Sequence, residues 1–201
     1  HLHNFVPRSR ANGPGERAVV WVQGCPRRCP GCWNPDSLRF DRRNETPVSE
    51  LVDRISAVGG LSGVTFSGGE PFSHAAPLAE LARQLRVRMG EKFSVVCFSG
   101  HTLEQFSAGA EKHPEWADLL KEVDLLVDGA YVESLRSIGQ PLRGSSNQKL
   151  HYLSGRIRPE EVNPSTAEFT LGADGVVTQT GYPEIPDAAE VFAEAANLGK
   201  I

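Results

Sequence analysis

Apolar residues recur along the chain with two different periods up to about residue 153. Four short runs of β-branched and aromatic residues have the near-continuous apolarity of strands buried on both faces: Ala18–Val22, Gly63–Phe66, Phe93–Phe98 and Val123–Val127. Segments between them carry an apolar residue at every third or fourth position, which predicts helices at about 46–58, at 75–89, from Thr102 onward and from Pro114 through Leu120. Thr102-Leu-Glu-Gln105 also has the pattern of a capping box.

Strands that alternate with helices in this way predict right-handed βαβ units and a largely parallel sheet. The fold class is therefore α/β. About 150 residues hold too few such units to close an eight-stranded barrel. We expect a partial, open (β/α) barrel.

The two ends of the chain have a different character. Residues 1–16 are polar and turn-rich, so no strand or helix is predicted there. Lys149–Leu153 is a possible further strand. Beyond it, two short strand-like runs, Glu168–Leu171 and Val176–Gln179, flank Asp174-Gly175, which predicts a hairpin. A short helix is predicted from Asp187 to about Leu198. We therefore divide the chain into a core domain, 1–153, and a C-terminal extension, 154–201, which packs on the core.

Composition excludes several classes of protein. The 201 residues are 39 % hydrophobic and carry a formal net charge of −4 with both signs interspersed, so neither a nucleic acid nor an anionic membrane is an expected partner. No apolar run reaches the roughly 18–20 residues that span a bilayer, and the N-terminus lacks a signal-peptide pattern. The clustering of the four cysteines argues against disulfides. A cytoplasmic location is expected.

Small and polar residues follow each of the four predicted parallel strands. The carboxyl ends of parallel strands share one edge of a sheet, where α/β proteins build their ligand sites. We therefore expect four loops to meet there: the cysteine loop after Val22, Gly68-Gly69-Glu70, Ser99-Gly100 and Asp128-Gly129. This convergence predicts one composite site.

The cysteine loop, Cys25-Pro-Arg-Arg-Cys29-Pro-Gly-Cys32, holds three thiols at C-x3-C-x2-C spacing. Three thiolates leave one coordination position of a metal centre unfilled. An iron–sulfur cluster with one open iron and a zinc site with a fourth ligand from elsewhere are both compatible with this spacing. Cys97 or one of the six scattered histidines is a candidate for that ligand, although no histidine lies at zinc-finger spacing and the apolar strand around Cys97 favours a buried small side chain.

The remaining candidates each have a plain structural alternative. Gly68-Gly69-Glu70 is either a strand-to-helix turn or a segment that binds a cationic amino group. Asp128 and Ser99 either cap turns or contact a ligand. Arg143 either pairs with a surface carboxylate or clamps a ligand carboxylate. Trp33, next to the last cysteine, can shield a cluster from solvent.

Five segments of the chain, in this order, resemble the radical S-adenosylmethionine (SAM) superfamily, and within it the activating enzymes of anaerobic (class III) ribonucleotide reductase. They are Asn12-Gly-Pro-Gly15, Gly24 through Asn34, Ser67-Gly-Gly-Glu-Pro71, Val127-Asp-Gly129 and Arg143-Gly-Ser-Ser-Asn-Gln148. The resemblance spans roughly residues 3–153. It implies the partial barrel of that superfamily.

The resemblance also implies the site. Cys25, Cys29 and Cys32 would hold a [4Fe–4S] cluster whose fourth iron is chelated by SAM. Gly68, Gly69 and Glu70 would bind the methionine amino group. Ser99, Asp128 and Arg143 are further candidate residues for SAM, the first two by position only. Cleavage of SAM would yield a 5′-deoxyadenosyl radical, which abstracts a hydrogen atom from a glycine of a glycyl radical enzyme, with flavodoxin or ferredoxin as electron donor.

Two other functions remain open at this point. A small radical SAM enzyme can use the same scaffold to act directly on a metabolite or peptide. A zinc or iron–sulfur module without catalysis is the third hypothesis. The extension after Leu153 is longer than expected for this subgroup, and it can cover the barrel, contact a partner or simply pack.

Overall fold

The computed structural model describes residues 1–42, 44–137, 139–162, 167–171 and 177–181. Its main feature is one six-stranded sheet with the strand order β1-β2-β3-β4-β5-β6. The four inner strands are parallel: β2 (Arg17–Val22), β3 (Gly63–Gly68), β4 (Ser94–Phe98) and β5 (Leu125–Asp128). The edge strands β1 (Leu2–Ser9) and β6 (Lys149–Tyr152) pair antiparallel to their neighbours. The prediction of an α/β fold with a largely parallel sheet is confirmed.

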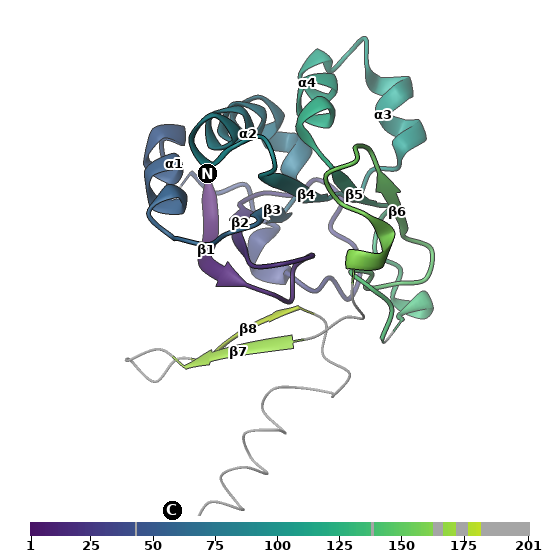
Figure 1. Cartoon of the computed structure of the whole chain (residues 1–201). Coiled ribbons are helices and arrows are strands. Elements are labelled where there is room, and N and C mark those ends of the chain that lie inside the picture. Colours follow the sequence, from purple (N-terminus) through teal and green to yellow (C-terminus); the bar gives the residue numbers. More distant parts are fainter. Residues whose placement is uncertain (43, 138, 163–166, 172–176, 182–201) are drawn as a thin grey trace, which may run out of the picture.

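Four helices connect the inner strands: α1 (Val48–Ser56), α2 (Ala75–Met89), α3 (Leu103–Gly109) and α4 (Pro114–Glu122). Figure 1 shows α1, α2 and α4 on the same side of the sheet. Their positions match the predicted helices, and the predicted capping box forms, with the Thr102 hydroxyl and the Gln105 side chain each accepting a backbone N–H. Among the described residues, no helix is long and apolar enough to cross a membrane.

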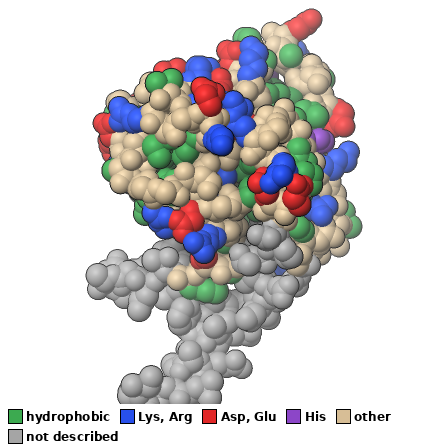
Figure 2. All heavy atoms as spheres, in the orientation of Figure 1, with side chains coloured by type: hydrophobic (Ala, Val, Ile, Leu, Met, Phe, Trp, Pro, Cys, Tyr) green, Lys and Arg blue, Asp and Glu red, His purple; other side chains and the backbone are tan. Residues whose placement is uncertain are grey.

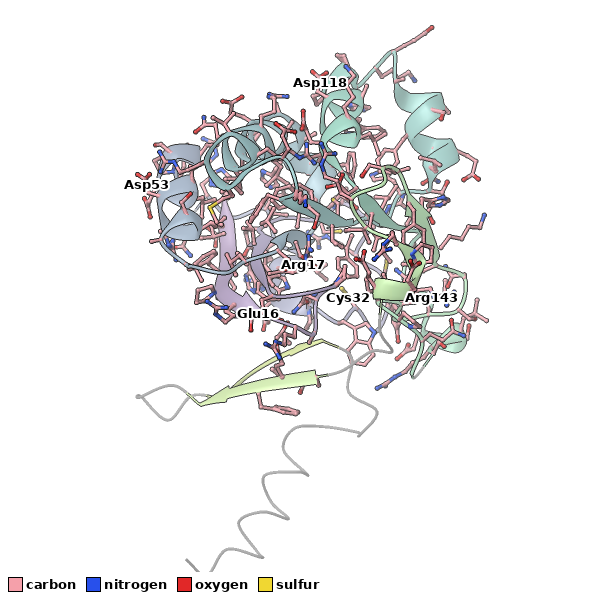
Figure 3. The ribbon with its side chains drawn as sticks, viewed as in Figure 1. Glu16, Arg17, Cys32, Asp53, Asp118 and Arg143 are labelled. Carbon is pink, nitrogen blue, oxygen red and sulfur yellow. The ribbon has the colours of Figure 1, made fainter. Side chains whose placement is uncertain are left out.

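The helix-covered face of the sheet carries the larger hydrophobic core. The predicted apolar stripe of α2 is buried there, and Leu78, Leu81 and Leu85 belong to the same core cluster as Val64 and Phe66 of β3. In contrast, Asp53 of α1 and Asp118 of α4 are exposed on the outside of their helices (Figure 3). Burial of one stripe against the sheet stabilises each helix more than its intrinsic propensity does.

The opposite face of the sheet has a smaller core that includes part of the extension. Val96, Leu125 and Val127 contribute buried side chains from β4 and β5. Leu142, from the loop before β6, and Ile157, which is 3 % exposed, pack on them. The first residues after the predicted core domain therefore belong to its packing.

Strand β1 corrects the prediction that residues 1–16 contain no regular element. The polar residues that suggested a loop lie on an edge strand, which needs only one partner and leaves much of its surface exposed. Leu2 and Phe5 pack against the large core, and Arg54 lies 4.4 Å over the Phe5 ring. Two apolar contacts and pairing with β2 are enough to fix the strand.

The amino ends of the parallel strands are fastened by a buried arginine. The Arg17 guanidinium, shown inside the ribbon in Figure 3, donates to the Pro14 and Ser94 carbonyl oxygens at 3.1 and 2.8 Å and to the Thr65 hydroxyl at 2.9 Å. Burial lowers its pKa to about 9. The segment Asn12–Gly15 therefore lies at the edge opposite the cysteine loop, where it completes the fold.

The predicted C-terminal hairpin is confirmed as β7 (Ala167–Leu171) and β8 (Val177–Gly181). It attaches near the turn between β1 and β2, below the sheet in Figure 1. Glu168 accepts a hydrogen bond from the Ser9 hydroxyl and one of 2.8 Å from the Arg10 N–H. Asn12 donates to the Thr180 hydroxyl at 2.7 Å. The predicted helix from Asp187 to Leu198 lies outside the described residues.

Candidate functional site

The loops after the parallel strands meet at one shallow cavity of about 90 Å³ that opens to solvent. All three clustered cysteines line it, together with residues of three other loops: Gly68, Gly69, Glu70, Ser99, Gly100 and Gly129. The predicted convergence of four loops is therefore present. A larger polar hollow of about 750 Å³ lies beside residues 35–44, and none of the cysteines is among its described lining residues.

The surroundings of the cysteine loop disfavour free thiolates. The Sγ atom of Cys32 accepts the Asn34 N–H at 3.4 Å, and the backbone N–H groups of Arg27 and Arg28 offset part of the rise in the pKa of Cys25. Burial raises the pKa of both thiols, and neighbouring cysteines raise it further. A positive metal centre would relieve both effects, because it favours the thiolate form.

The three thiols lie near one another but are not gathered around a single point. Among the described residues, no three His, Cys, Asp or Glu side chains are close enough to share one ion. The three cysteines nevertheless line one cavity, and the charges of Cys25 and Cys29 each raise the pKa of Cys32.

Glu70 joins two of the loops. It is 1 % exposed, and its carboxylate accepts the Phe72 N–H at 3.0 Å, the Ser99 hydroxyl at 2.8 Å and the Gly100 N–H at 2.9 Å. Burial raises its pKa, while these hydrogen bonds and the nearby Arg27 guanidinium oppose the shift. A buried carboxylate with three donors is fixed in place, and an ionised oxygen can accept a further donor from a ligand.

Gly68 and Gly69 serve close packing of backbones as well as lining the cavity. A Cβ at Gly69 would lie 2.3 Å from the Gly24 carbonyl oxygen, and one at Gly68 would lie 2.7 Å from Val22 backbone atoms. Gly68 also has a φ of +99°, which favours glycine. The two glycines let the β3 loop approach the start of the cysteine loop.

Asp128 and Arg143 are not among the described residues that line this cavity. The Asp128 carboxylate accepts the Leu103 N–H at the start of α3 at 2.7 Å and lies 2.9 Å from Nε2 of His151. Arg143 lies in the loop before β6 and, in the view of Figure 3, on the same side as Cys32. The described contacts of Asp128 hold α3 to the end of β5.

The structure adds lining residues that the sequence argument did not select. Gln148 donates to the Gly129 carbonyl oxygen at 2.9 Å and accepts the Gly144 N–H at 2.9 Å, so it closes the loop before β6. Tyr131 meets the Trp33 ring edge-on at 6.3 Å, and Arg136 lies 4.6 Å over that ring. Gln148 belongs to the segment Arg143–Gln148, which resembles the family. For Tyr131, the only indication in the sequence was its position two residues after Gly129.

Comparison with known proteins identifies the family. The family model described as a 4Fe-4S single cluster domain matches residues 11–151. The chain is similar to the anaerobic ribonucleoside-triphosphate reductase-activating protein of Escherichia coli K12, with 30 % identity over 163 residues, 76 % of this chain and 99 % of that protein. The chain belongs to the radical SAM activase family. This activase is also similar to the reductase-activating protein of phage T4, with 30 % identity over 153 residues, 73 % of the chain and 90 % of the relative.

A second kind of relative shares a shorter region with the activase. The pyruvate formate-lyase-activating enzyme of Staphylococcus epidermidis is 37 % identical over 94 residues, which cover 43 % of this chain and 37 % of that enzyme. The cofactors of the activase are a [4Fe–4S] cluster and SAM. The cavity fits them, since it offers three thiol ligands with N–H groups directed at two of them and a buried carboxylate.

Proposed function

We propose that this chain activates a glycyl radical enzyme, with an anaerobic ribonucleotide reductase as the main candidate. One observation carries the proposal: the three-cysteine cavity lies within a chain that covers almost the whole length of relatives named as activating proteins of that reductase. When bound and reduced by one electron, the cluster and SAM supply a 5′-deoxyadenosyl radical that removes a hydrogen atom from a glycine.

The residues of the chain would bind and orient these groups. Cys25, Cys29 and Cys32 would be the cluster ligands. The fixed carboxylate of Glu70 would accept hydrogen bonds from the methionine amino group, and Ser99 would hold that carboxylate through the hydrogen bond already described. Gly68 and Gly69 would keep the backbone close to the ligand. No side chain has to move a proton for this reaction.

The other predicted residues would support the site without binding the cluster or SAM themselves. Asp128 would act by holding the start of α3, and Arg143 would act through the loop before β6. Trp33, with Tyr131 and Arg136 beside it, would limit the access of solvent to the cluster near Cys32. These assignments are supported by the position of each residue relative to the cavity.

The proposal extends to the shape of the sheet, the location of the protein, its electron donor and its domains. We infer that the open sheet curves as a partial barrel around the cavity, and that the chain works in the cytoplasm. The electron would come from flavodoxin or ferredoxin. A core domain of 1–153 with an extension of 154–201 remains our proposed division, with the qualification that Ile157 packs in the core.

The test uses the full chain, reconstituted with iron and sulfide without oxygen. With dithionite and SAM it should form 5′-deoxyadenosine, and with a reductase partner it should produce the doublet of a glycyl radical in the electron paramagnetic resonance (EPR) spectrum. Formation of 5′-deoxyadenosine without a radical on any glycyl radical enzyme would refute the activase function. A chain that binds one zinc ion and no iron would refute both enzyme functions.

Replacement of one ligand tests the cysteine assignment. Cys29→Ser should lose the iron–sulfur absorbance and lower SAM cleavage by at least about 100-fold, because a cluster held by two cysteines has lost part of its anchoring. Cys97→Ser is the matched control, since Cys97 is buried in β4 and is not among the residues that line the cavity. Equal iron content in wild type and Cys29→Ser would contradict the assignment.

A further inference from the structure

Two adjacent arginines in the cysteine loop have different surroundings. Arg27 lines the cavity, and its Nη2 atom donates to the Gln105 side-chain oxygen at 2.7 Å and lies 2.9 Å from Nδ1 of His101. Arg28, the next residue, is exposed. Arg27 therefore connects the cysteine loop to the turn between β4 and α3.

The His101 end of this connection is rigid. Its ring packs against Phe106 and Trp116, with ring centroids 5.6 and 4.9 Å away. Burial, with a further contribution from the Arg27 charge, lowers the pKa of His101 to about 4. The ring is therefore neutral near pH 7, and its Nδ1 atom can accept the hydrogen bond from Arg27.

The same turn holds Glu70. Ser99 and Gly100, which bind the Glu70 carboxylate, directly precede His101. The Arg27 side chain packs on Gly100, where a Cβ would lie only 2.3 Å from the Arg27 Cδ atom. Arg27 and Glu70 thus contact one short turn, one from the cluster-binding loop and the other from the loop proposed to bind SAM.

We propose that Arg27 is a positioning residue, which fixes the cysteine loop against the β4–α3 turn so that SAM can contact the open iron and Glu70 together. The proposal rests on the cofactors of the proposed function. SAM held by both loops would have an affinity that depends on their relative position. The Nη2 atom of Arg27 lies within hydrogen-bond distance of both His101 and Gln105, so one end of a single side chain ties the cysteine loop to that turn and to α3.

The test compares two variants with the same change of charge. Arg27→Gln and Arg28→Gln are made in the full chain and reconstituted without oxygen. We measure iron content, the Kd for SAM, and the EPR spectrum of the reduced cluster with and without SAM. Loss of a residue that orients metal ligands typically costs about 10–100-fold. Arg27→Gln should keep its iron and raise the Kd for SAM by that factor, with a smaller spectral change on SAM addition.

Arg28→Gln should match the wild type in all three measurements. An unchanged Kd in Arg27→Gln, or an equal increase in Arg28→Gln, would overturn the proposal. Arg27→Lys separates position from charge, because lysine keeps the charge but lacks the planar guanidinium whose Nη2 atom reaches His101 and Gln105. Its Kd should stay raised, and full recovery of SAM affinity would show that charge alone is needed, which would also overturn the proposal.

A further pair of variants applies if Arg27→Gln takes up no cluster. Gln105→Ala removes one acceptor of Arg27 from α3 and leaves the cysteine loop unchanged, while Thr102→Ala disturbs the same helix cap without touching Arg27. A raised Kd in Gln105→Ala alone supports the proposal, and equal Kd values in both contradict it. A wild type that binds no SAM would instead refute the proposed function.

Discussion

At the scale of single residues, the site depends on contacts between loops that are distant in sequence. Glu70 accepts from Ser99 and Gly100, 29 and 30 residues away, and Arg27 contacts Gln105 across 78 residues. The Glu70 bonds join the loops after β3 and β4, and the Arg27 bond joins the loop after β2 to helix α3. A substitution at any of them is therefore expected to change the geometry of the cavity as well as one contact.

The depressed pKa of His101 predicts a pH dependence of stability. In the unfolded chain the ring takes up a proton near pH 6.5, and in the folded chain only near about 4. The unfolded state binds more protons between these values, so stability is lost as the pH falls through that window. Because the ring is only half-buried, we expect a loss of about 1–2 kcal/mol after solvent screening.

Urea unfolding of wild type and His101→Gln at pH 4.5 and 7 measures this loss. Glutamine cannot titrate in this range, so the difference in unfolding free energy between the two pH values should be smaller in the variant. Parallel pH profiles for the two proteins would assign the effect to other groups. The prediction concerns the chain without cofactors and needs no activity.

At the scale of elements, the ends of strands and helices fasten each other. The Asp128 carboxylate at the end of β5 binds the first N–H of α3 and lies beside His151 of β6. A carboxylate at a helix N-terminus is stabilising, because it satisfies a free N–H and the helix dipole favours negative charge. Asp128 thus connects three elements of the fold.

Asp128→Asn should lower the free energy of unfolding by about 1–2 kcal/mol. The Kd for SAM should rise by less than about 10-fold, the minimum expected for Arg27→Gln, because Asp128 lies outside the cavity lining and acts only by holding the start of α3. Thermal unfolding and SAM binding on the same preparation separate the two effects. A large loss of SAM affinity with unchanged stability would instead make Asp128 a ligand for SAM.

At the scale of the whole molecule, the described chain after β6 packs against the six-stranded sheet and its turns without adding a strand to it. Ile157 packs on the face without helices, Arg156 lies 3.1 Å from Asp124, and the hairpin attaches at the turn between β1 and β2. This turn is at the amino ends of the parallel strands, so the hairpin is fastened at the edge opposite the cysteine loop. Charged side chains of both signs are interspersed on the face shown in Figure 2.

Ile157→Ala tests the contribution of this segment. Removing a buried isoleucine side chain should lower the free energy of unfolding by about 2–4 kcal/mol. Leu153→Ala is the matched control, since Leu153 is 39 % exposed and should lose less than about 1 kcal/mol. Equal losses in urea unfolding would mean that Ile157 is not part of the packed core.

Much of the fold could be predicted from the sequence, because its signals are local. The four parallel strands were recognised as short apolar runs, because a strand buried on both faces is apolar at nearly every position. Helix α2 was recognised by its apolar stripe, because a helix buried on one side is apolar at every third or fourth position. β1 was missed because an edge strand of mixed polarity has neither period. Gly68-Gly69-Glu70 was selected by its position after a predicted strand, and the three cysteines by their C-x3-C-x2-C spacing.

The sequence by itself determined the fold class, the family and the cysteine loop, because these depend on spacing along the chain. Only the tertiary structure decided how the candidates are used. It placed Asp128 at a helix start and Asn12–Gly15 at the far edge of the sheet. It also separated Arg27 from Arg28, which sequence cannot do, because their difference lies in partners more than 70 residues away.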